Sequence, residues 1–191
     1  MKRLRRVFRK QIVPAAQTLA HHLKFIDESG VNLGLTRLFG RATPGQRVVE
    51  ATPGTSGPHY TVVAAVGLDG VQAPWLLEGA MNTVSFETYV EQILVPTLRV
   101  GDWVVLDNLS VHKGSPVRSA IEARGAQIIF LPPYSPDLNP IELCWAKVKT
   151  ALRAAKARTW DTLVDALASA LRAVSPADIQ AWFTHCGYAS P

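Results

Sequence analysis

The sequence predicts an α/β domain with a central mixed five-stranded sheet flanked by helices. Three observations support this fold class. The chain has 191 residues, of which 48% are hydrophobic, enough for one domain with a buried core. Five short apolar runs have the composition of strands, and five longer segments have helical spacing or helix-start signals. Their order is three strands, a helix, a strand, a helix, a strand and then three helices, which predicts an antiparallel meander followed by right-handed crossovers between parallel strands.

The first part of the chain is predicted to hold three strands and one long connection. The run "HLKFIDES" over residues 22–29 is apolar and ends in two acids, which indicates a strand. The runs "YTVVAAVG" (60–67) and "VQAPWLL" (71–77) are joined by "LDG", which indicates a hairpin. Residues 31–59 are rich in Gly, Pro, Thr and Arg, so we expect a hairpin or an irregular insertion there.

The second part alternates helices and strands. Residues 83–98 carry apolar side chains near helical spacing, and "DWVVLDN" (102–108) is a β-rich run that should pair in parallel with the last strand. A helix over 115–125, closed by its final glycine, and a buried strand over 126–131 follow. The remaining segments, each with a helix-start signal, predict helices over residues 140–157, 160–173 and 176–185.

Positive charge is concentrated at two places in the chain. The net charge is +5, and residues 1–13 hold six basic residues and no acid. We therefore divide the chain into a basic N-terminal segment, residues 1–20, and one domain, residues 21–191. A second basic cluster lies between residues 147 and 158. Clustered positive charge suits a polyanion, and solvated surface is an equally good interpretation from charge alone.

Composition also excludes several classes of protein. No run approaches the roughly 20 apolar residues that span a bilayer, and the basic N-terminus lacks the apolar stretch of a secretory signal. Cys144 and Cys186 form neither a disulfide framework nor a zinc pattern, so both are interpreted as free thiols in a reducing compartment. We expect a cytoplasmic protein with no membrane partner.

Asp27 and Asp107 share a local pattern, because each follows an apolar run on a predicted central strand. If these strands are parallel neighbours, both carboxylates lie at the carboxyl ends, the edge where open α/β sheets bind ligands. Two close carboxylates repel each other unless a proton or a cation lies between them, and oxygen ligands suit Mg²⁺ or Mn²⁺. Taken singly, each aspartate is also explained as a strand end or a turn residue.

Glu142 follows a stiff loop, "LPPYSPDLNPIELCW", that contains four prolines. Proline fixes φ and restricts the residue before it, so this loop holds the start of the next helix in a definite place. The spacing Asn139-x-x-Glu142, with Pro140 at the first helical position, is also that of a helix capping box. Capping alone therefore explains Glu142, although the same geometry aims its carboxylate off the end of the helix.

The segments "FIDES", "VVLDNLSVHK" and "LPPYSPDLNPIELCWAKVKTALR" resemble the catalytic domain of the insertion-sequence-630 family of transposases, bacterial relatives of the mariner elements. The resemblance covers about residues 23–158 and implies an RNase H-like fold for the domain over 21–191. It implies a D, D, E triad of Asp27, Asp107 and Glu142, and the 34 residues between the last two are typical of the family.

The resemblance also implies a reaction and its partners. We expect two Mg²⁺ or Mn²⁺ ions held by the triad, cleavage of double-stranded DNA at transposon ends, strand transfer into target DNA (often at TA), and a homodimer when active. Family members carry N-terminal helix-turn-helix units, whereas only 26 residues precede Asp27 here. We therefore expect recognition of the transposon ends to need a separate or frame-fused helix-turn-helix partner.

Other side chains receive roles from their positions. Asn108, His112 and Lys113 follow the second aspartate, and we assign them to the surroundings of the metal or to DNA phosphates; for His112 and Lys113 a surface position is the alternative. Lys149 and Arg153 lie on the helix face that leads away from Glu142 and are assigned to DNA. Trp145 and Val148 should pack into the core. Tyr134 is interpreted as support for the proline turn, with stacking on a base as the alternative.

Three functions remain open from the sequence. The first is an active transposase, which the presence of all three acids favours. The second is a catalytically silent DNA-binding remnant of a transposase. The third is another RNase H-like nuclease, against which the proline motif argues.

Overall fold

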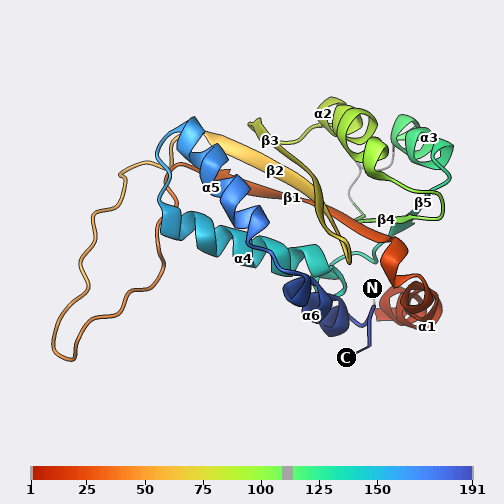
Figure 1. The fold of residues 1–191 in the computed structure, drawn as a ribbon, viewed down its shortest axis with the longest axis horizontal. Helices are drawn as coiled ribbons and strands as arrows, with labels where there is room; N and C mark the ends of the chain where they lie inside the picture. Colours follow the sequence, from red (N-terminus) through yellow and green to blue (C-terminus); the bar gives the residue numbers. More distant parts are fainter. Residues whose placement is uncertain (1, 109–113, 191) are drawn as a thin grey trace.

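The five predicted strands form one mixed sheet in the order β3-β2-β1-β4-β5 (Figure 1). The computed structural model describes residues 2–108 and 114–190. β1 pairs antiparallel with β2 and parallel with β4, β2 pairs antiparallel with β3, and β4 pairs in parallel with β5. The predicted meander and parallel pairing are therefore confirmed. The strands are β1 (Leu23–Asn32), β2 (His59–Gly67), β3 (Gly70–Glu78), β4 (Trp103–Leu106) and β5 (Gln127–Phe130).

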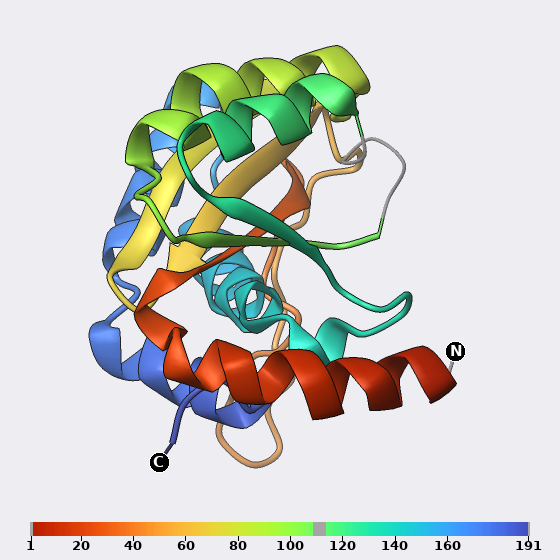
Figure 2. The ribbon, with the colours of Figure 1, turned by 90° about the vertical axis from the view of Figure 1, so that its right-hand side faces the viewer.

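Helices cover both faces of the sheet, as the near-continuous apolar character of the central strands requires. Neighbouring residues of one strand enter opposite cores: Phe25 of β1 joins one core and Ile26 joins the other. α4, α5 and α6 cover one face and α2 and α3 the other (Figures 1 and 2). None of the described helices is long and apolar enough to cross a membrane. The helices are α1 (Lys2–Thr18), α2 (Thr83–Tyr89), α3 (Ser115–Ala123), α4 (Pro140–Ala155), α5 (Trp160–Arg172) and α6 (Pro176–Cys186).

The helix predicted over residues 83–98 changes its winding along its length. α2 is followed by a π-helical turn, Val90–Leu94, and a 3₁₀ turn, Val95–Thr97. Pro96 explains the end of the regular helix, because it has no N–H to donate and its ring clashes with the preceding turn. The segment still covers the sheet, since Val90 and Leu94 are buried in the core on this face.

The connection between β1 and β2, residues 33–58, contains no helix or strand and extends away from the body (Figure 1). Of the two expected forms, the irregular insertion is the one observed. Leu33 and Leu35 pack against the core, but other apolar side chains of the connection face solvent, with Phe39 89% exposed and Val49 85% exposed. A connection of this length without secondary structure is uncommon in a compact domain and is usually either functional or a linker segment.

The basic N-terminal segment forms α1, an element that the sequence did not predict. Phe8 and Ala16 are buried in the core beneath α4 and α6, and Ile12 and Val13 pack beside them. The helix lies alongside the C-terminal part of the chain in both ribbon views (Figures 1 and 2). The boundary between a segment over 1–20 and a domain over 21–191 stays a prediction.

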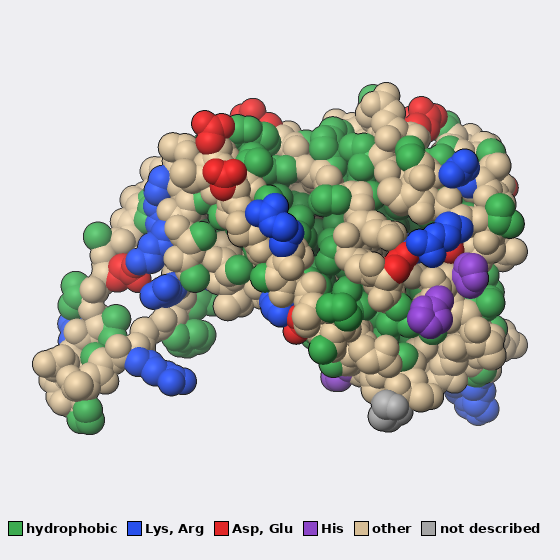
Figure 3. Space-filling model, viewed as in Figure 1, with side chains coloured by type: hydrophobic (Ala, Val, Ile, Leu, Met, Phe, Trp, Pro, Cys, Tyr) green, Lys and Arg blue, Asp and Glu red, His purple; other side chains and the backbone are tan. Residues whose placement is uncertain are grey.

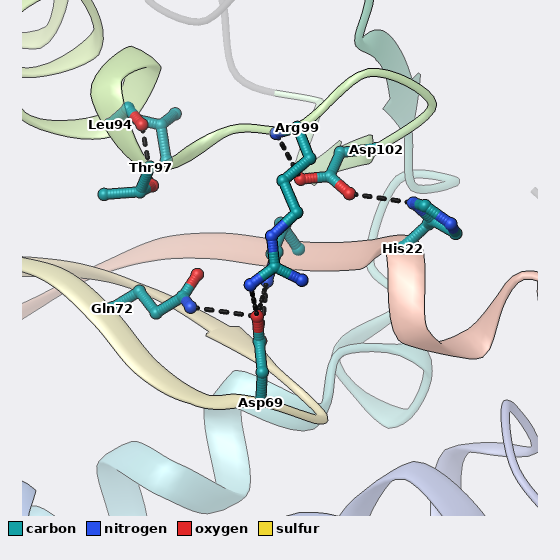
Figure 4. A network of polar contacts seen from close by, with 8 residues as sticks. His22, Asp69, Gln72, Leu94, Thr97, Arg99 and Asp102 are labelled. Atoms are coloured by element: carbon teal, nitrogen blue, oxygen red, sulfur yellow. Dashed lines mark hydrogen bonds and ion pairs between the residues drawn. The ribbon is translucent and has the colours of Figure 1, made fainter.

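A buried ion pair joins the strands at the edge of the sheet opposite the carboxyl end of β4. Lys24 of β1 is 1% exposed, and its Nζ donates to both carboxylate oxygens of Asp69 at 2.6 Å. Partial burial acts to raise the pKa of Asp69, but the hydrogen bond and charge of Lys24 outweigh it and lower the pKa. Arg99 and Gln72 also donate to Asp69 (Figure 4). Gly67 leaves room for the pair, because a Cβ there would lie 2.7 Å from Asp69 Oδ1.

His22 and Asp102 extend this group of polar contacts towards β4. The Asp102 carboxylate is 1% exposed, lies 3.0 Å from His22 Nδ1 and accepts a hydrogen bond from the backbone N–H of Arg99 (Figure 4). The start of β1 and the start of β4 are thus connected through side chains as well as through the strand ladder.

We expect Asp69→Asn to lower the free energy of unfolding by about 3 kcal/mol, because it leaves the buried Lys24 ammonium without a counter-charge. Chemical denaturation measures the effect. Lys24→Met in the Asp69→Asn background removes the unpaired charge and should recover part of the loss. Glu122→Gln is the control, because its exposed pair with Arg118 contributes about 0.5 kcal/mol or less. Equal losses in Asp69→Asn and Glu122→Gln would contradict a buried role for the Lys24 pair.

Candidate active site

Asp27 and Asp107 lie on the neighbouring parallel strands β1 and β4. The last pair in register is Phe25 with Val105, and Asp27 and Asp107 stand two residues further along each chain. Asp107 directly follows β4, as predicted, whereas Asp27 lies in the middle of β1 and pairs with Ala64 of β2. The expectation that Asp27 ends its strand is therefore wrong. The two acids still share one edge, because β1 runs on beyond the end of β4.

Glu142 lies in the first turn of α4, directly after the proline loop, residues 131–139. Pro140 occupies the first helical position as predicted, but the predicted capping box is absent, because the Asn139 side chain makes no capping hydrogen bond. The backbone N–H of Asn139 donates instead to Pro136 O at 3.0 Å, within the 3₁₀ turn Pro136–Leu138. That amide is no longer available to the Glu142 carboxylate. Capping therefore does not explain Glu142.

One pocket brings the three acids together. Its volume is about 500 Å³, and its walls come from the ends of β1 and β4, the proline loop and the start of α4. Asn108, next to Asp107 in the chain, lines it as well. The lining residues are Asp27, Asp107, Asn108, Leu131, Pro132, Pro133, Tyr134, Ser135, Pro136, Asn139 and Glu142.

The electrostatics of the pocket are set by crowded negative charge. Burial is the largest of the causes that together raise the pKa of Asp27 to about 7; the negative charges of Glu142, Glu28 and Asp107 act in the same direction, and a backbone hydrogen bond from Glu28 acts against them. A carboxylate in this setting is stabilised either by a proton or by a cation. A strongly perturbed carboxyl group in a pocket is also a common mark of a functional site.

The helix α1, far away in the sequence, holds one side of the proline loop. Arg5 of α1 donates to Tyr134 O at 2.9 Å, to Ser135 Oγ at 3.1 Å and to Asp137 Oδ2 at 2.6 Å. Arg9 donates to the same Asp137 oxygen at 2.8 Å. We call these contacts the loop clamp. The hydrogen bond from Arg5 lowers the pKa of Asp137 despite partial burial, so the clamp stays ionised at neutral pH.

The far side of the loop is held by the C-terminus. Tyr188 Oη donates to Leu138 O at 2.8 Å, and this bond is buried. Together with the prolines, these contacts fix the segment that carries Glu142.

The residues assigned to DNA lie in three different situations. Asn108 is exposed at the pocket. Lys149 and Arg153 are half-buried on α4, and no ion pair within residues 2–108 and 114–190 includes either of them. His112 and Lys113 lie outside the described residues.

Other cations of the second basic cluster are engaged within the chain. Lys147 pairs with Asp178, Lys156 pairs with Glu50, and Arg158 donates to Leu33 O at 2.8 Å. This difference separates Lys149 and Arg153 from their neighbours. Trp145 and Val148 are buried, as predicted, whereas Ala146 is exposed and Lys149 and Arg153 are half-buried.

The donors around the pocket fit Mg²⁺ or Mn²⁺. They are carboxylate and amide oxygens, the ligands that these hard cations prefer. Asn139 Oδ1 is buried without a hydrogen-bond partner among the described atoms, which leaves one oxygen at the pocket for a ligand or water. The part of the chain that the structure describes has no set of three His, Cys, Asp or Glu gathered around one point.

Sequence reasoning missed Arg5, Arg9 and Asn139. The two arginines were counted only as charge, and nothing in the local pattern links them to Asp137 more than 120 residues away. The Asn139 side chain was assigned to capping. The local sequence pattern carried no signal that this side-chain oxygen would lack a partner.

Comparison with solved structures supports the architecture. The strand transfer complex of Mos1 superposes with a TM-score of 0.73 and 17% identity, covering 96% of this chain and 57% of that chain. The Mos1 mariner paired end complex with Mn superposes with a TM-score of 0.72 and 16% identity, covering 96% of this chain and 58% of that chain. The Mos1 transposase catalytic domain with raltegravir and Mg superposes with a TM-score of 0.68 and 15% identity, covering 97% of this chain and 85% of that chain. At these identities the likeness shows the fold, and the predicted RNase H-like class is confirmed.

The chain spans little more than half of the Mos1 chains in those complexes. The search of curated proteins gives no match. The family profile described as DDE superfamily endonuclease matches residues 22–164, a region that contains all three acids. This chain belongs to the DDE superfamily endonucleases.

Proposed function

We propose that this chain is the catalytic part of a transposase, which cleaves DNA at transposon ends and joins the freed strand to target DNA. One observation supports this most strongly: Asp27, Asp107 and Glu142, far apart in the sequence, line a single pocket in a DDE endonuclease fold. The solved relatives are transposase complexes with DNA ends and a strand transfer product. The protein would act on the nucleoid in the cytoplasm.

The triad would hold two divalent cations. We assign Asp27 as the ligand shared by both ions, because its carboxyl group experiences the charges of both Glu142 and Asp107. Asp107 would be the second protein ligand of one ion, and Glu142 would be the second protein ligand of the other ion. Two such ions would stabilise charge on the attacking and leaving oxygens of an in-line displacement.

The chain's own residues would align the DNA for two successive displacements. In the first, water attacks the phosphorus and the 3′ oxygen leaves, so that the transposon strand ends in a free 3′-hydroxyl. In the second, that hydroxyl attacks a phosphodiester of the target and displaces its 3′ oxygen. Neither step needs a nucleophilic side chain of the protein. The proline loop and the loop clamp would keep Glu142 in place through both steps.

The DNA would follow α4 away from the pocket. Lys149 and Arg153 lie about 10 and 16 Å from Glu142 by helical rise. Lys and Arg side chains also gather where the 33–58 connection leaves the body (Figure 3). Backbone contacts of this kind give salt-sensitive binding without sequence preference, so a helix-turn-helix partner would supply recognition of the transposon ends.

A homodimer is part of this proposal. The 33–58 connection exposes Leu38, Phe39 and Val49 at 68%, 89% and 85%, on a segment that stands away from the body. Exposed apolar side chains concentrated in one segment suit a protein interface. A second copy of the chain, brought in by the paired DNA ends, is the partner that we propose.

One assay separates the three functions left open by the sequence. The protein is incubated with Mn²⁺ and labelled DNA that carries candidate terminal repeats. Strand transfer supports the transposase, binding without cleavage supports a silent remnant, and structure-specific nicking supports another RNase H-like nuclease.

Asp107→Ala is expected to abolish cleavage while leaving the circular dichroism spectrum unchanged, because it removes one ion's ligand and buries no new group. Its metal-free stability should not fall, because a repelling carboxylate is removed. Cleavage at the wild-type rate would show that the triad is wrongly assigned.

Without metal at pH 8, Asp27→Asn should raise the free energy of unfolding by up to about 4 kcal/mol, the equivalent of a pKa raised from 3.8 to about 7. Because the pKa is higher in the folded chain, wild-type stability falls as the pH rises from about 4 to about 7. The advantage of the variant should therefore vanish near pH 4, which denaturation at several pH values measures.

The stabilities of wild type and Asp27→Asn should also be compared in the presence of Mn²⁺. At pH 8 the cation should stabilise the wild type more than Asp27→Asn, because the shared ligand is missing in the variant. An equal stabilisation of both proteins would argue against Asp27 as a metal ligand.

Lys149→Ala and Arg153→Ala should each flatten the plot of log K against log[salt] by about one unit, because each phosphate contact contributes roughly 0.9 on duplex DNA. Affinity should fall about equally for all DNA sequences. Lys147→Ala is a matched control on the same helix, because Lys147 already pairs with Asp178 and its loss should leave the slope unchanged. Unchanged slopes in all three variants would show that this part of α4 does not contact DNA phosphates.

A further inference from the structure

One edge of the sheet is formed by β3, and its two halves differ (Figure 1). The first half has two features that hinder pairing with a further strand. Ala73 has a φ of +49° beside the irregularity in the β2–β3 ladder, and Pro74 has no N–H to donate. The second half, residues 75–78, contains no proline, no lysine and no residue with positive φ. This half of the edge is therefore open to strand pairing.

The backbone groups of Leu76 and Glu78 face the open edge. Antiparallel neighbours alternate between pairs that exchange both backbone hydrogen bonds and pairs that exchange none. Gly79 N–H donates to His59 O at 2.8 Å, and the next pair in register is Glu78 with Tyr60. Glu78, and Leu76 two residues before it, therefore direct their N–H and C=O groups away from β2. These are the groups that an added strand would bind.

A pocket of about 510 Å³ adjoins the same half of β3. Tyr60 and Glu78 are cross-strand neighbours, so their side chains share one face of the sheet. On this face the ring of Trp160, at the start of α5, lies 5.1 Å from the ring of Tyr60, and Trp160 is 42% exposed. Aromatic faces beside a carboxylate suit a cation. The lining residues are Tyr60, Trp75, Leu76, Leu77, Glu78 and Trp160.

Negative charge gathers around this pocket, although the net charge of the chain is +5. Glu78, Asp161 and Asp165 are exposed, and no ion pair within residues 2–108 and 114–190 includes any of them. Acidic side chains gather over the start of α5 in Figure 3. Such a surface favours a cationic partner and disfavours the same edge of a second copy, whose acids would repel these.

We propose that residues 75–78 of β3 bind an extended segment of a partner protein, which adds a sixth strand to the sheet and places an arginine or lysine in the pocket beside Glu78. In such strand addition, backbone hydrogen bonds supply affinity and alternate side chains supply specificity. A residue opposite Glu78 has its side chain on the face of Tyr60 and Trp160. Two positions away, opposite Leu76, an apolar side chain fits. The segment is therefore recognised by a cationic and an apolar residue two positions apart.

This site is separate from the proposed reaction on DNA. None of the residues that line it lines the pocket of the three acids, and β2 lies between β3 and the strand that carries Asp27. Binding of the segment is therefore expected without DNA and without a divalent cation. A failure of the transposase proposal in the Mn²⁺ assay and a failure of this one are distinct results.

The probe is a short, end-capped, fluorescein-labelled peptide with an arginine at its centre, a valine two positions away on each side, and threonines between them. Its symmetrical pattern fits either strand direction. Fluorescence anisotropy measures its affinity for the full chain in the absence of DNA and metal. A peptide of the same design with glutamate at its centre is the reference, and it should bind more weakly.

Two N-methylated versions of the arginine peptide test strand addition. One carries methyl groups on the amides of the arginine and the valines, and the other carries them on the amides of the threonines. Successive N–H groups of a strand point to opposite edges, and only one edge of the peptide faces β3. One version should therefore lose binding while the other keeps it. Equal affinities of the two versions would rule out an added strand and overturn the proposal.

Glu78→Gln and Trp160→Ala should each weaken binding of the arginine peptide about tenfold, because each removes one contact with the cation. Glu91→Gln is the matched control, since it removes an exposed acid from the helical segment on the opposite face of the sheet and should leave the affinity unchanged. Glu78→Lys should reverse the preference and bind the glutamate peptide more tightly than the arginine peptide. Misfolding does not produce such an exchange.

Three further results would overturn the proposal. The first is an arginine peptide that wild type binds no more tightly than the glutamate peptide. The second is an affinity for the arginine peptide that is the same in Glu78→Gln, Trp160→Ala and wild type. The third is sedimentation that shows wild type associating with itself through this edge and excluding the peptide, because the occupant would then be a second copy of the chain.

Discussion

The mutual repulsion of the carboxylates around one pocket is the constraint on which the rest of this structure depends. Asp27, Asp107 and Glu142 come from three separate elements and line the same space. A chain free to relax would move such groups apart, because like charges in a half-buried site are costly. Burial and the neighbouring acids raise the pKa of Asp27 to about 7, which measures that cost in the absence of a counter-ion. The fold holds the acids together, and cations would relieve the repulsion.

Different parts of the fold resist this repulsion. The parallel ladder of β1 and β4 sets the two aspartates side by side, and the buried Lys24–Asp69 pair connects the other end of the sheet. Glu142 has no strand to hold it, so its position depends on the proline loop. Prolines limit the conformations of that loop, while α1 and the C-terminal Tyr188 hold its two sides. The N-terminal helix thereby serves the site through packing as well as through its charge.

Much of the fold could be predicted from the sequence, because apolar runs and their order determine which strands lie in the centre. Those runs predicted all five strands, the antiparallel meander of the first three and the parallel pairing of the last two. The shared edge of Asp27 and Asp107 was predicted on the condition that their strands are parallel neighbours, which β1 and β4 are. The helix α1 was missed because its arginines obscured an apolar stripe, Phe8, Ile12 and Ala16, that recurs every fourth residue. The π turn after α2 depends on Pro96 within an otherwise helical pattern.

The three acids of the site could be predicted from the sequence, but the contacts that hold them in place could not. A spacing of three residues between Asn139 and Glu142 predicted a capping box, but a 3₁₀ turn takes the amide that the box requires. The pairing of Arg5 with Asp137 joins two ends of the chain that no local pattern connects. Tyr134 was interpreted as support for the proline turn, but it is 85% exposed, and this exposure depends in the same way on tertiary contacts. Side chains whose roles arise from long-range packing are those that a single sequence does not reveal.

Anomalous scattering from crystals of the protein grown with Mn²⁺ tests the central claim most directly, because it locates the cation without reference to activity. The account predicts a manganese peak in the pocket between the carboxylates of Asp27 and Asp107, with a second peak towards Glu142 when DNA is bound. A crystal in which manganese binds elsewhere, while these three carboxylates hold none at saturating cation, would contradict the account.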